Sequence, residues 1–460
     1  MSATVAIVLA AGKGTRMRSE LPKVLHQIAG WSLAEWSVNA ALEAGADRCV
    51  VVVGHGRERV EGVLRERFGD RVTFALQEEQ LGTGHAVRCA VEQRLQRFDG
   101  RVLVTYGDCP LIQGPTLAQL LASDAPCALL TTHRDDPTGY GRMVRKDGQI
   151  AAIVEHKDAT PEQRAICEVN PGLYAFDGGF LQRALEQLDM NNAQGELYLT
   201  DLVAMAERVD DFVVPIDEVR GINDRRELAE CGELMRRRIA ERWASAGAAI
   251  EDLGAVYIGA DCEVQPDARI DAGVHLRGKT RIESGAHVDV GCVLRDVHVS
   301  AGAYLHPYTV AAESQIGAKA QVGPFTHLRP KTNLGEGSKV GNFCETKKTN
   351  LGKGSKVNHL AYVGDGEIGE GVNIGAGVIF CNYDGVKKHT TTLEDGVFIG
   401  SDSQLVAPIT VGQGAYVASG STITRDVPAD ALALSRTKQE NKEGYASRLR
   451  RRMEAAKKKA

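Results

Sequence analysis

Aromatic residues, paired cysteines, long apolar runs and excess basic charge are scarce or absent in this chain of 460 residues. No apolar run reaches the roughly 18 residues of a membrane span, and no basic segment precedes the first apolar run, so we predict neither a membrane span nor a signal peptide. The ten cysteines form no CxxC pair, which favours reduced thiols over a zinc ribbon or a disulfide framework. Lys plus Arg number 55 against 60 Asp plus Glu, and this net charge of −5 disfavours a nucleic-acid binder. We therefore expect a cytoplasmic protein without nucleic acid as a partner.

The scarcity of aromatic residues is uneven along the chain. Aromatics make up 5% of the residues, and none of the three tryptophans falls between Gly254 and Ile423. That same stretch holds 26 of the 50 glycines. Two different architectures are therefore expected to share this chain.

Short β-branched runs alternate with helical patterns in the first half of the sequence. Strands are expected at residues 4–10, 49–53, 72–76 and 101–105, and helices at 33–43, 57–67 and 84–96. This alternation predicts a Rossmann-like α/β domain with a mostly parallel sheet, whose ligands bind at the carboxyl ends of the strands. A long helix is expected at 225–248, after which the pattern changes.

Beyond Gly254, aliphatic residues recur at every sixth position. Three unbroken series carry this period: Ile258, Val264, Ile270, Leu276, Ile282 and Val288; Ile316, Val322, Leu328, Leu334 and Val340; and Leu393, Ile399, Leu405, Val411, Val417 and Ile423. Such a period with Gly, Ala and Asp between is typical of a hexapeptide-repeat β-helix, in which three repeats close a coil of about 18 residues. Chance alternation in a β-sandwich is the weaker interpretation. Residues 381–389 interrupt the period, and a loop ejected from a regular solenoid is more often functional than accidental.

The first strand runs into a glycine-rich turn that carries three cations, Lys13, Arg16 and Lys23. Glycines allow backbone N–H groups to approach phosphate oxygens, and cations neutralise them. The turn is not a Walker A loop, because the pattern GxxxxGK[ST] is absent, and it is not a dinucleotide fingerprint, because Met17 stands where the third glycine would be. From these residues alone, a phosphate site and an ordinary turn remain open.

Two further motifs lie at strand ends in the same half. A Gly-Thr-Gly turn at 82–84 opens a predicted helix, so its N–H groups could hold a polar ligand. Asp108 follows the strand at 101–105, where a metal ligand for a bound phosphate is expected. Taken alone, Asp108 could equally be a turn residue that ends the strand.

Together these motifs resemble the nucleotidyltransferases that couple a sugar 1-phosphate to a nucleoside triphosphate. Further matches are residues 137–142, 155–158 and 221–223, and, in the repeat region, Lys347-Lys348, residues 359–362 and Asn382-Tyr383. With these, the sequence from Val5 to Arg436 resembles the bacterial bifunctional N-acetylglucosamine-1-phosphate uridyltransferase/glucosamine-1-phosphate acetyltransferase family. The resemblance implies an α/β nucleotidyltransferase followed by a left-handed parallel β-helix. The expected division is a uridylyltransferase domain at 1–225, a linker helix at 226–250, an acetyltransferase β-helix at 251–435 and a basic tail at 436–460.

The resemblance implies a uridylyl-transfer site in the first domain, where UTP and N-acetylglucosamine 1-phosphate form UDP-N-acetylglucosamine and pyrophosphate. Arg16 and Lys23 would be the catalytic cations, and Mg²⁺ would be held by Asp108 and Asn223. The nucleotide and sugar contacts carry over to Leu9, Ala10, Ala11, Gly12, Lys23, Gln77, Gly82, Thr83, Tyr106, Gly107, Asp108, Gly141, Glu155, Asn170 and Asn223. Pro171 departs from the threonine that the family commonly has there, and it removes a backbone donor beside the sugar.

The resemblance also implies an acetyl-transfer site on the β-helix, with acetyl-CoA and glucosamine 1-phosphate as substrates. His359 would be the base that deprotonates the sugar amine, since a neutral imidazole suits that role near pH 7; without the family it could be a turn residue. The sugar-phosphate contacts carry over to Arg329, Lys347, Tyr362 and Asn373, and the acetyl-CoA contacts to Ala376, Asn382, Tyr383, Ser401, Ser419 and Arg436. Ser419 replaces a usual alanine and Thr346 a usual apolar residue. Family acyl sites lie between neighbouring β-helices, so a homotrimer is implied.

Three functions compete at this point. The first is the bifunctional enzyme, and the second is a nucleotidyltransferase whose β-helix serves only oligomerisation. The third is a regulatory or exchange-factor subunit that has lost catalysis. The second predicts no His359 and no loop at 381–389, and the third predicts degraded Arg16, Lys23, Asp108 and Asn223; all of these are present. The bifunctional enzyme is therefore favoured.

Overall fold

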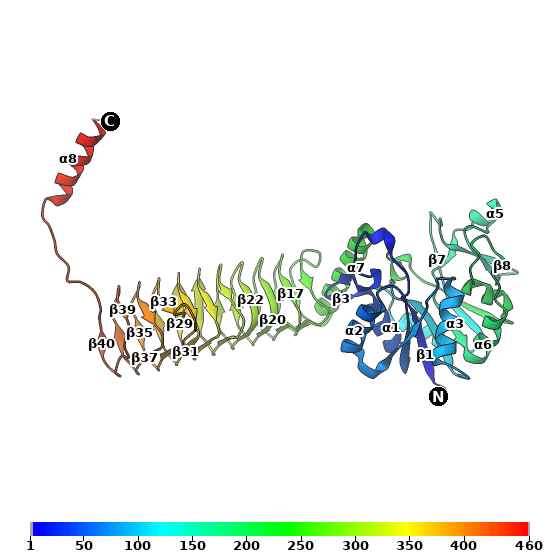
Figure 1. Cartoon of the computed structure of the whole chain (residues 1–460), viewed down its shortest axis with the longest axis horizontal. Coiled ribbons are helices and arrows are strands. Elements are labelled where there is room, and N and C mark those ends of the chain that lie inside the picture. The colour runs from blue at the N-terminus through cyan, green and yellow to red at the C-terminus, as the bar shows by residue number, and fades with distance from the viewer. Residues whose placement is uncertain (1–2, 459–460) are drawn as a thin grey trace. The chain divides into compact units, whose positions relative to one another are not determined.

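The computed structural model describes residues 3–458 and divides into two compact units between Ile239 and Ala240. Figure 1 shows an α/β unit at the N-terminal side of this division and a stack of short parallel strands at the other. The change of architecture that the glycine and tryptophan distributions predict is therefore present.

The first unit is built on a ten-stranded sheet in the order β5-β4-β1-β6-β11-β7-β10-β8-β9, with β12 beside β7. Its strands are β1 (Thr4–Leu9), β4 (Arg48–Val53), β5 (Val72–Leu76), β6 (Arg101–Tyr106), β7 (Cys127–His133), β8 (Gly141–Lys146), β9 (Gln149–Val154), β10 (Glu168–Asn170), β11 (Tyr174–Asp177) and β12 (Val209–Val213). Strands β5, β4, β1 and β6 pair in parallel, as predicted. Beyond β6 the pairs β6–β11, β11–β7, β7–β10, β10–β8 and β8–β9 are antiparallel, and β8 and β9 form a hairpin, so the sheet is mixed.

Helices cover both faces of this sheet. They are α1 (Leu33–Glu43), α2 (Arg57–Phe68), α3 (Thr83–Arg94), α4 (Gly114–Ala122), α5 (Pro161–Arg164) and α6 (Gly178–Glu186), with short elements β2 (Gln27–Ile28), β3 (Trp31–Ser32), η1 (Thr15–Met17), η2 (Lys23–Leu25), η3 (Gly69–Arg71), η4 (Leu199–Met205) and η5 (Ile216–Glu218). Along β1, Val5 and Ile7 enter one core with α3 and α6, while Ala6 and Val8 enter the other with α1 and α2. Burial on both faces explains why β1 is an unbroken apolar run.

Helix α7 (Arg225–Ser245) is the long helix expected at 225–248. Asp224 stands just before it, and its Oδ1 accepts from the Glu227 backbone N–H at 2.9 Å, which satisfies a donor of the first turn. This cap fixes the start of the helix next to Asn223, a predicted site residue.

The second unit is a left-handed parallel β-helix, as predicted, with every strand pairing in parallel. One sheet contains β13 (Ala249–Ile250), β16 (Arg269–Ile270), β19 (His287–Val288), β21 (Tyr304–Leu305), β23 (Gln321–Val322), β26 (Lys339–Asn342), β29 (Lys356–His359), β32 (Asn373–Ile374), β35 (Phe398–Ile399), β38 (Tyr416–Val417) and β40 (Leu432–Ala433). The other contains β14 (Tyr257–Ile258), β15 (Glu263–Val264), β17 (His275–Arg277), β18 (Arg281–Ile282), β20 (Val293–Val299), β22 (Val310–Ile316), β24 (His327–Leu328), β25 (Thr332–Leu334), β27 (Glu345–Lys347), β28 (Thr349–Leu351), β30 (Tyr362–Gly364), β31 (Gly366–Ile368), β33 (Ile379–Cys381), β34 (Thr391–Leu393), β36 (Gln404–Val406), β37 (Ile409–Val411) and β39 (Thr422–Ile423).

The register of the β-helix confirms the expected coil length. Ile258 pairs with Leu276, and Leu276 with Leu294, so every third hexapeptide stacks on the one before. These aliphatic side chains are fully buried and form a continuous interior column. Ile374 pairs with Ile399 instead, because the inserted loop lengthens that coil.

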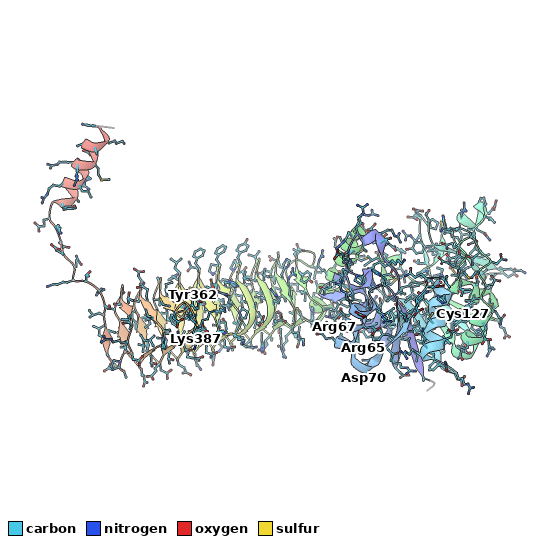
Figure 2. All side chains as sticks on the ribbon, in the orientation of Figure 1. Arg65, Arg67, Asp70, Cys127, Tyr362 and Lys387 are labelled. Atoms are coloured by element: carbon cyan, nitrogen blue, oxygen red, sulfur yellow. The ribbon has the colours of Figure 1, made fainter. Side chains whose placement is uncertain are left out.

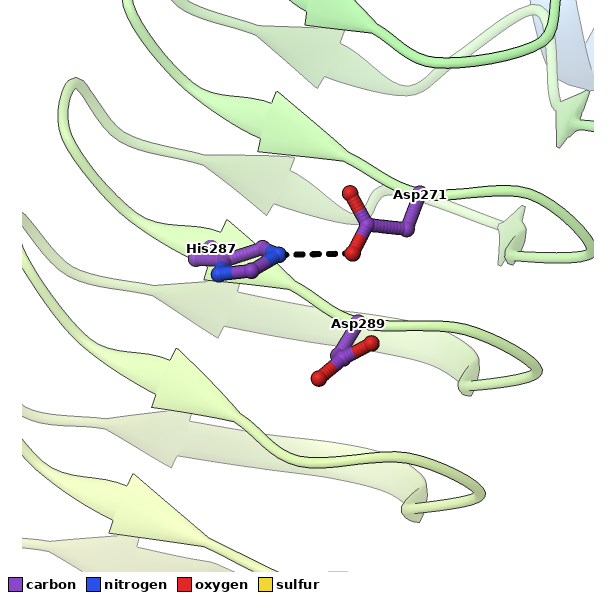
Figure 3. A group of neighbouring side chains, drawn as sticks. All are labelled: Asp271, His287 and Asp289. Atoms are coloured by element: carbon purple, nitrogen blue, oxygen red, sulfur yellow. Dashed lines mark hydrogen bonds and ion pairs between the residues drawn. The ribbon is translucent and has the colours of Figure 1, made fainter.

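A ladder of polar side chains joins successive coils at Asp271, His287 and Asp289, as Figure 3 shows. His287 Nε2 lies 2.8 Å from Asp271 Oδ2, and Arg269 donates to the other Asp271 oxygen, also at 2.8 Å. Tyr304 stacks on His287 and donates to Asp289 at 2.7 Å. The spacing could hold a cation, but both carboxylates already have protein partners, so we assign the ladder to pairing between coils.

The chain ends in helix α8 (Tyr445–Lys457), which buries none of its described residues. Between residues 3 and 458, the structure contains no helix with the length and apolar character of a membrane span.

Candidate active sites

The carboxyl ends of β1 and β6 and the start of α3 enclose a cavity of about 350 Å³ in the first unit. Gly107 N–H donates to Leu9 O at 2.9 Å, which holds the two strand ends together. Ten of the predicted nucleotide-site residues line this cavity: Leu9, Ala10, Ala11, Gly12, Lys23, Gln77, Gly82, Thr83, Tyr106 and Asp108. The sequence interpretation missed four more, Val24, Gln80, Ala86 and Glu196. Gln80 was visible within its motif; Glu196 comes from a loop that carries no motif.

The glycine-rich turn brings Lys23 to the cavity. Gly14 has a φ of 61°, and a Cβ there would lie 2.5 Å from Lys23 Cβ, so a side chain at this position would displace the lysine. Gln80 Nε2 donates to Ala11 O at 2.7 Å and fixes the turn from the other side. The residues of this turn therefore position a cation rather than merely reverse the chain.

An ion pair and a hydrogen bond from a cationic side chain lie beside Asp108. Lys23 Nζ forms an ion pair with Asp108 Oδ2, and Arg16 Nη2 donates to Asn223 Oδ1 at 2.8 Å. Ile222 N–H donates to Asp108 O at 3.0 Å, so the 221–223 segment lies against Asp108 although it is more than one hundred residues away in sequence. The predicted metal ligands thus offer one carboxylate and one amide oxygen, each now facing a cationic side chain. Such an all-oxygen donor set fits a hard divalent cation.

The three predicted sugar contacts lie together, outside the lining of that cavity. Asn170 pairs with Gly141 between β10 and β8, and a Cβ on Gly141 would lie 3.7 Å from Glu155 Oε1. Thr200 donates to Glu155 Oε1 at 3.1 Å. Burial raises the pKa of Glu155, so its carboxyl keeps a proton to higher pH than a free glutamic acid.

Tyr106 links the two groups. Its ring packs on Gly172, where a Cβ would lie 2.3 Å from Tyr106 Cε2. Burial raises the pKa of the Tyr106 hydroxyl, and the charges of Glu155 and Asp108 add to this effect. Tyr106 therefore stands between the cavity and the sugar contacts. The neighbouring Pro171 does not disturb Asn170, whose Oδ1 accepts from Gly172 N–H at 3.0 Å.

A second constellation follows one edge of the β-helix. Asn342 pairs with His359 between β26 and β29. The same register continues through the next coils, where Ile374 pairs with Ile399 and Ile399 with Val417. The residues two positions after each of these three therefore also stack along the edge, and they are Ala376, Ser401 and Ser419. Arg436 Nη1 donates to Ser419 O at 2.8 Å and joins the end of the row. The geometry therefore brings His359 and four of the predicted acetyl-CoA contacts into one line.

The orientation of the His359 ring depends on Asn342, which the sequence interpretation missed. His359 Nδ1 lies 2.7 Å from Asn342 Oδ1. Because an amide oxygen only accepts, Nδ1 carries the hydrogen, and the neutral ring keeps a lone pair on Nε2. The position of Asn342 one coil before His359 was the available signal.

Cationic and aromatic side chains gather on the neighbouring coils. Arg329 Nη1 pairs with Glu345 at 2.6 Å. Lys388, on the inserted loop, lies against Lys347 and is the main reason that the Lys347 pKa is lowered, with Arg329 adding to it. Lys388 was not predicted as a site residue. An anion placed between these cations would relieve their repulsion.

The inserted loop is anchored over the same coils. Asn382 Nδ2 donates to Asp365 Oδ2 at 2.6 Å, and a Cβ on Gly364 would meet both Asn382 and the Tyr362 hydroxyl within 2.6 Å. Figure 2 shows Tyr362 and Lys387 in the same part of the β-helix. Tyr383 is 59% exposed and so is available to a ligand. Asn373, in β32, lies in register between Lys356 and Phe398.

Thr346 occupies an interior position of the stack, between Leu328 and Val363 in register. Its hydroxyl lies 3.0 Å from Thr332 Oγ1, so the buried polar group has a partner. This departure from an apolar residue is thereby compensated within the chain.

Comparisons with known proteins agree with this division. A family of MobA-like NTP transferase domains matches residues 6–175, and a hexapeptide repeat of succinyl-transferase matches residues 390–425. A curated protein of Sorangium cellulosum called "Bifunctional protein GlmU" is 53% identical, covering 99% of this chain and 98% of its own length. Proteins of the same name are 46% identical in Pelobacter propionicus, covering 98% of this chain and 100% of that protein, and 46% identical in Corynebacterium efficiens, covering 98% and 95%.

Proposed function

Because this chain belongs to the bifunctional GlmU family, it is a bifunctional transferase of UDP-N-acetylglucosamine synthesis, and we propose that its two constellations divide the two reactions. Acetyl transfer from acetyl-CoA to glucosamine 1-phosphate takes place along the His359 edge, in a catalytic domain of residues 251–435. Uridylyl transfer from UTP to N-acetylglucosamine 1-phosphate takes place in the cavity beside Asp108, in a domain of residues 1–225. The product supplies precursors of the bacterial cell envelope.

In uridylyl transfer, the phosphate oxygen of N-acetylglucosamine 1-phosphate attacks the α-phosphorus of UTP, and pyrophosphate leaves. Lys23 and Arg16 donate to phosphate oxygens and offset the charge that develops on the leaving group. Glu155, Asn170 and Gly141 hold the sugar. This displacement requires no protein nucleophile.

The co-substrates of the family imply a metal, and Mg²⁺ fits the oxygen donors of Asp108 and Asn223. When bound, Mg²⁺ would neutralise the triphosphate and stabilise the leaving pyrophosphate. When UTP binds, Lys23 and Arg16 would exchange their present partners, Asp108 and Asn223, for phosphate oxygens. The contacts with Asp108 and Asn223 therefore hold these two cations near the place where the phosphates would bind, before the nucleotide arrives.

In acetyl transfer, the sugar ammonium must lose a proton before its nitrogen can attack the thioester. His359 Nε2 accepts this proton, while Asn342 keeps the ring in the required tautomer. Arg329 and Lys347 hold the sugar phosphate, with Tyr362 and Asn373 beside it. The amine forms a bond to the acetyl carbon and the carbon–sulfur bond breaks, which releases CoA.

The single observation that supports this proposal is that each unit holds its own group of chemically complementary residues. An activity test follows directly. The full chain is incubated with glucosamine 1-phosphate, acetyl-CoA, UTP and Mg²⁺, and free CoA thiol and pyrophosphate are assayed separately. We expect both products. Release of pyrophosphate without release of CoA would instead support a nucleotidyltransferase whose β-helix serves only oligomerisation.

We also propose that the chain forms a cytoplasmic homotrimer through the β-helix. Tyr308, Phe325, Phe343 and Leu360 form an apolar stripe at corresponding positions of four coils, and each is 51% to 62% exposed. The aromatic rings stack with centroids 5.3 and 5.6 Å apart. Leu360 directly follows His359, so the stripe borders the acetyl site. Light scattering should give a trimer mass for the wild type and a smaller mass for Phe325→Glu.

A further inference from the structure

A chain of hydrogen bonds connects Gln77, in the nucleotide cavity, with residues that line a second cavity. Gln77 is 5% exposed and lines the first cavity. His85 and Cys89, on successive turns of α3, line the second, which measures about 480 Å³. None of the functions described above assigns a role to His85 or Cys89.

The donors and acceptors of this chain can be assigned one by one. Gln77 Nε2 lies 3.2 Å from Gly82 O and 3.2 Å from His85 Nδ1. An amide nitrogen only donates, so both of its hydrogens are used and His85 Nδ1 must be unprotonated. The neutral ring then carries its hydrogen on Nε2, which lies 3.6 Å from Cys89 Sγ. Burial raises the pKa of Cys89, which keeps the sulfur as a thiol that can accept this hydrogen.

This arrangement leaves one polar atom of Gln77 free. Among residues 3–458, no donor reaches Gln77 Oε1. This oxygen is also not one of the buried side-chain atoms without a hydrogen-bond partner, so it remains accessible. A flipped amide would place Oε1 against Gly82 O, a contact between two acceptors that neither tautomer of His85 relieves. The side chain therefore presents an acceptor, not a donor, to the cavity.

We propose that His85 is a positioning residue that makes the cavity select uracil over cytosine by fixing the Gln77 amide. Uracil carries a hydrogen on N3, which Gln77 Oε1 can accept, whereas cytosine N3 is itself an acceptor and would face Oε1 unfavourably. A site built to hydrogen-bond one partner rejects the analogue that leaves buried groups unpaired. The inference rests on the proposed function, in which UTP binds in the cavity that Gln77 lines, and it places the base of UTP beside Gln77.

The test compares UTP and CTP as substrates of the full-length enzyme, with N-acetylglucosamine 1-phosphate and Mg²⁺. We expect His85→Leu to lower the ratio of kcat/KM for UTP to that for CTP about tenfold, the scale of one hydrogen bond, through a higher KM for UTP rather than a lower kcat. His85→Asn places its Oδ1 near the position of Nδ1 and should keep the ratio within about threefold of the wild type. Glu92→Ala, at an exposed position on the same helix, is the matched control and should change nothing.

Two results would overturn the inference. One is a folded His85→Leu enzyme, judged by its melting temperature and CoA release, that keeps the wild-type UTP:CTP ratio. The other is an equal fall of the UTP:CTP ratio in His85→Leu and His85→Asn, together with equally lowered melting temperatures. That result would show that His85 has only a structural role. Gln77→Leu distinguishes a failure of this inference from a failure of the proposed function. An unchanged UTP:CTP ratio in this variant would show that Gln77 does not contact the base, which would end the inference and leave the proposed uridylyl transfer intact. A wild type that releases no pyrophosphate would instead refute the proposed function.

Discussion

The two sites of this chain are assembled in opposite ways. The first unit brings Lys23, Asp108 and Asn223 together from segments far apart in sequence. Asp108 follows β6, whose end lies beside the end of β1, and both the Lys23 side chain and the segment before Asn223 contact Asp108. The β-helix instead repeats one position, so that Asn342 and His359 occupy the same edge in successive coils. Ligand geometry in the first unit is therefore a product of topology, and in the second a product of register.

This difference predicts different responses to mutation. A lost side chain in the cavity removes a contact that no neighbour can replace. A substitution along the β-helix edge changes one side chain in a row of stacked positions, while the coils above and below still hold the backbone in place. The following variants rank these effects.

Asp108→Ala should have the largest effect. Loss of the carboxylate removes a predicted Mg²⁺ ligand and leaves Lys23 without its partner, so uridylyl transfer should fall on the order of 10³-fold or more. Pyrophosphate release measures this loss. CoA release by the same variant is the control, and it should match the wild type. Near-normal uridylyl transfer at limiting Mg²⁺ would remove Asp108 from the site.

His359→Ala should lower acetyl transfer by about 10²–10⁴-fold, the contribution of a positioned base. Uridylyl transfer to supplied N-acetylglucosamine 1-phosphate should be unaffected, since His359 belongs to the other unit. Both rates and the melting temperature are measured. A well-folded variant that still acetylates within about threefold of the wild type would end the assignment as a base.

Asn342→Leu should have a smaller effect on the same reaction. The ring stays in place but loses the acceptor that holds the hydrogen on Nδ1, so acetyl transfer should fall about tenfold. Asn342→Asp keeps an oxygen acceptor and serves as the matched variant. Equal rates for wild type and Asn342→Leu would show that the 2.7 Å contact does not orient His359.

Thr346→Val should have the smallest effect. The hydroxyl bonded to Thr332 is replaced by a methyl group in an aliphatic column, and Thr332 keeps its bond to Arg329 O at 2.8 Å. The free energy of unfolding should change by less than about 1.5 kcal/mol, and both activities should persist. Chemical denaturation measures the change. A large loss of stability would show that the buried hydroxyl pair is needed to close that coil.

The sequence allowed the β-helix to be predicted almost residue by residue, because the six-residue period reports directly on which side chains point inward. It also placed the strand-end motifs that line the first cavity. Glu196 and Asn342 were missed for physical reasons: Glu196 lies on a loop without periodicity, and the role of Asn342 depends on its register with His359. The antiparallel strands beyond β6 were not predicted, because the direction of a strand depends on how distant segments pair and leaves no local pattern in the sequence.

The central claim is that two complete and independent sites share one chain. Its most direct test starts from glucosamine 1-phosphate, acetyl-CoA, UTP and Mg²⁺, and measures UDP-N-acetylglucosamine formed by Asp108→Ala alone, by His359→Ala alone and by their mixture. We predict little product from either variant and substantial product from the mixture, because acetylated intermediate released by Asp108→Ala is used by the intact cavity of His359→Ala. A mixture no more active than the variants alone, with both proteins folded, would contradict the independence of the two sites.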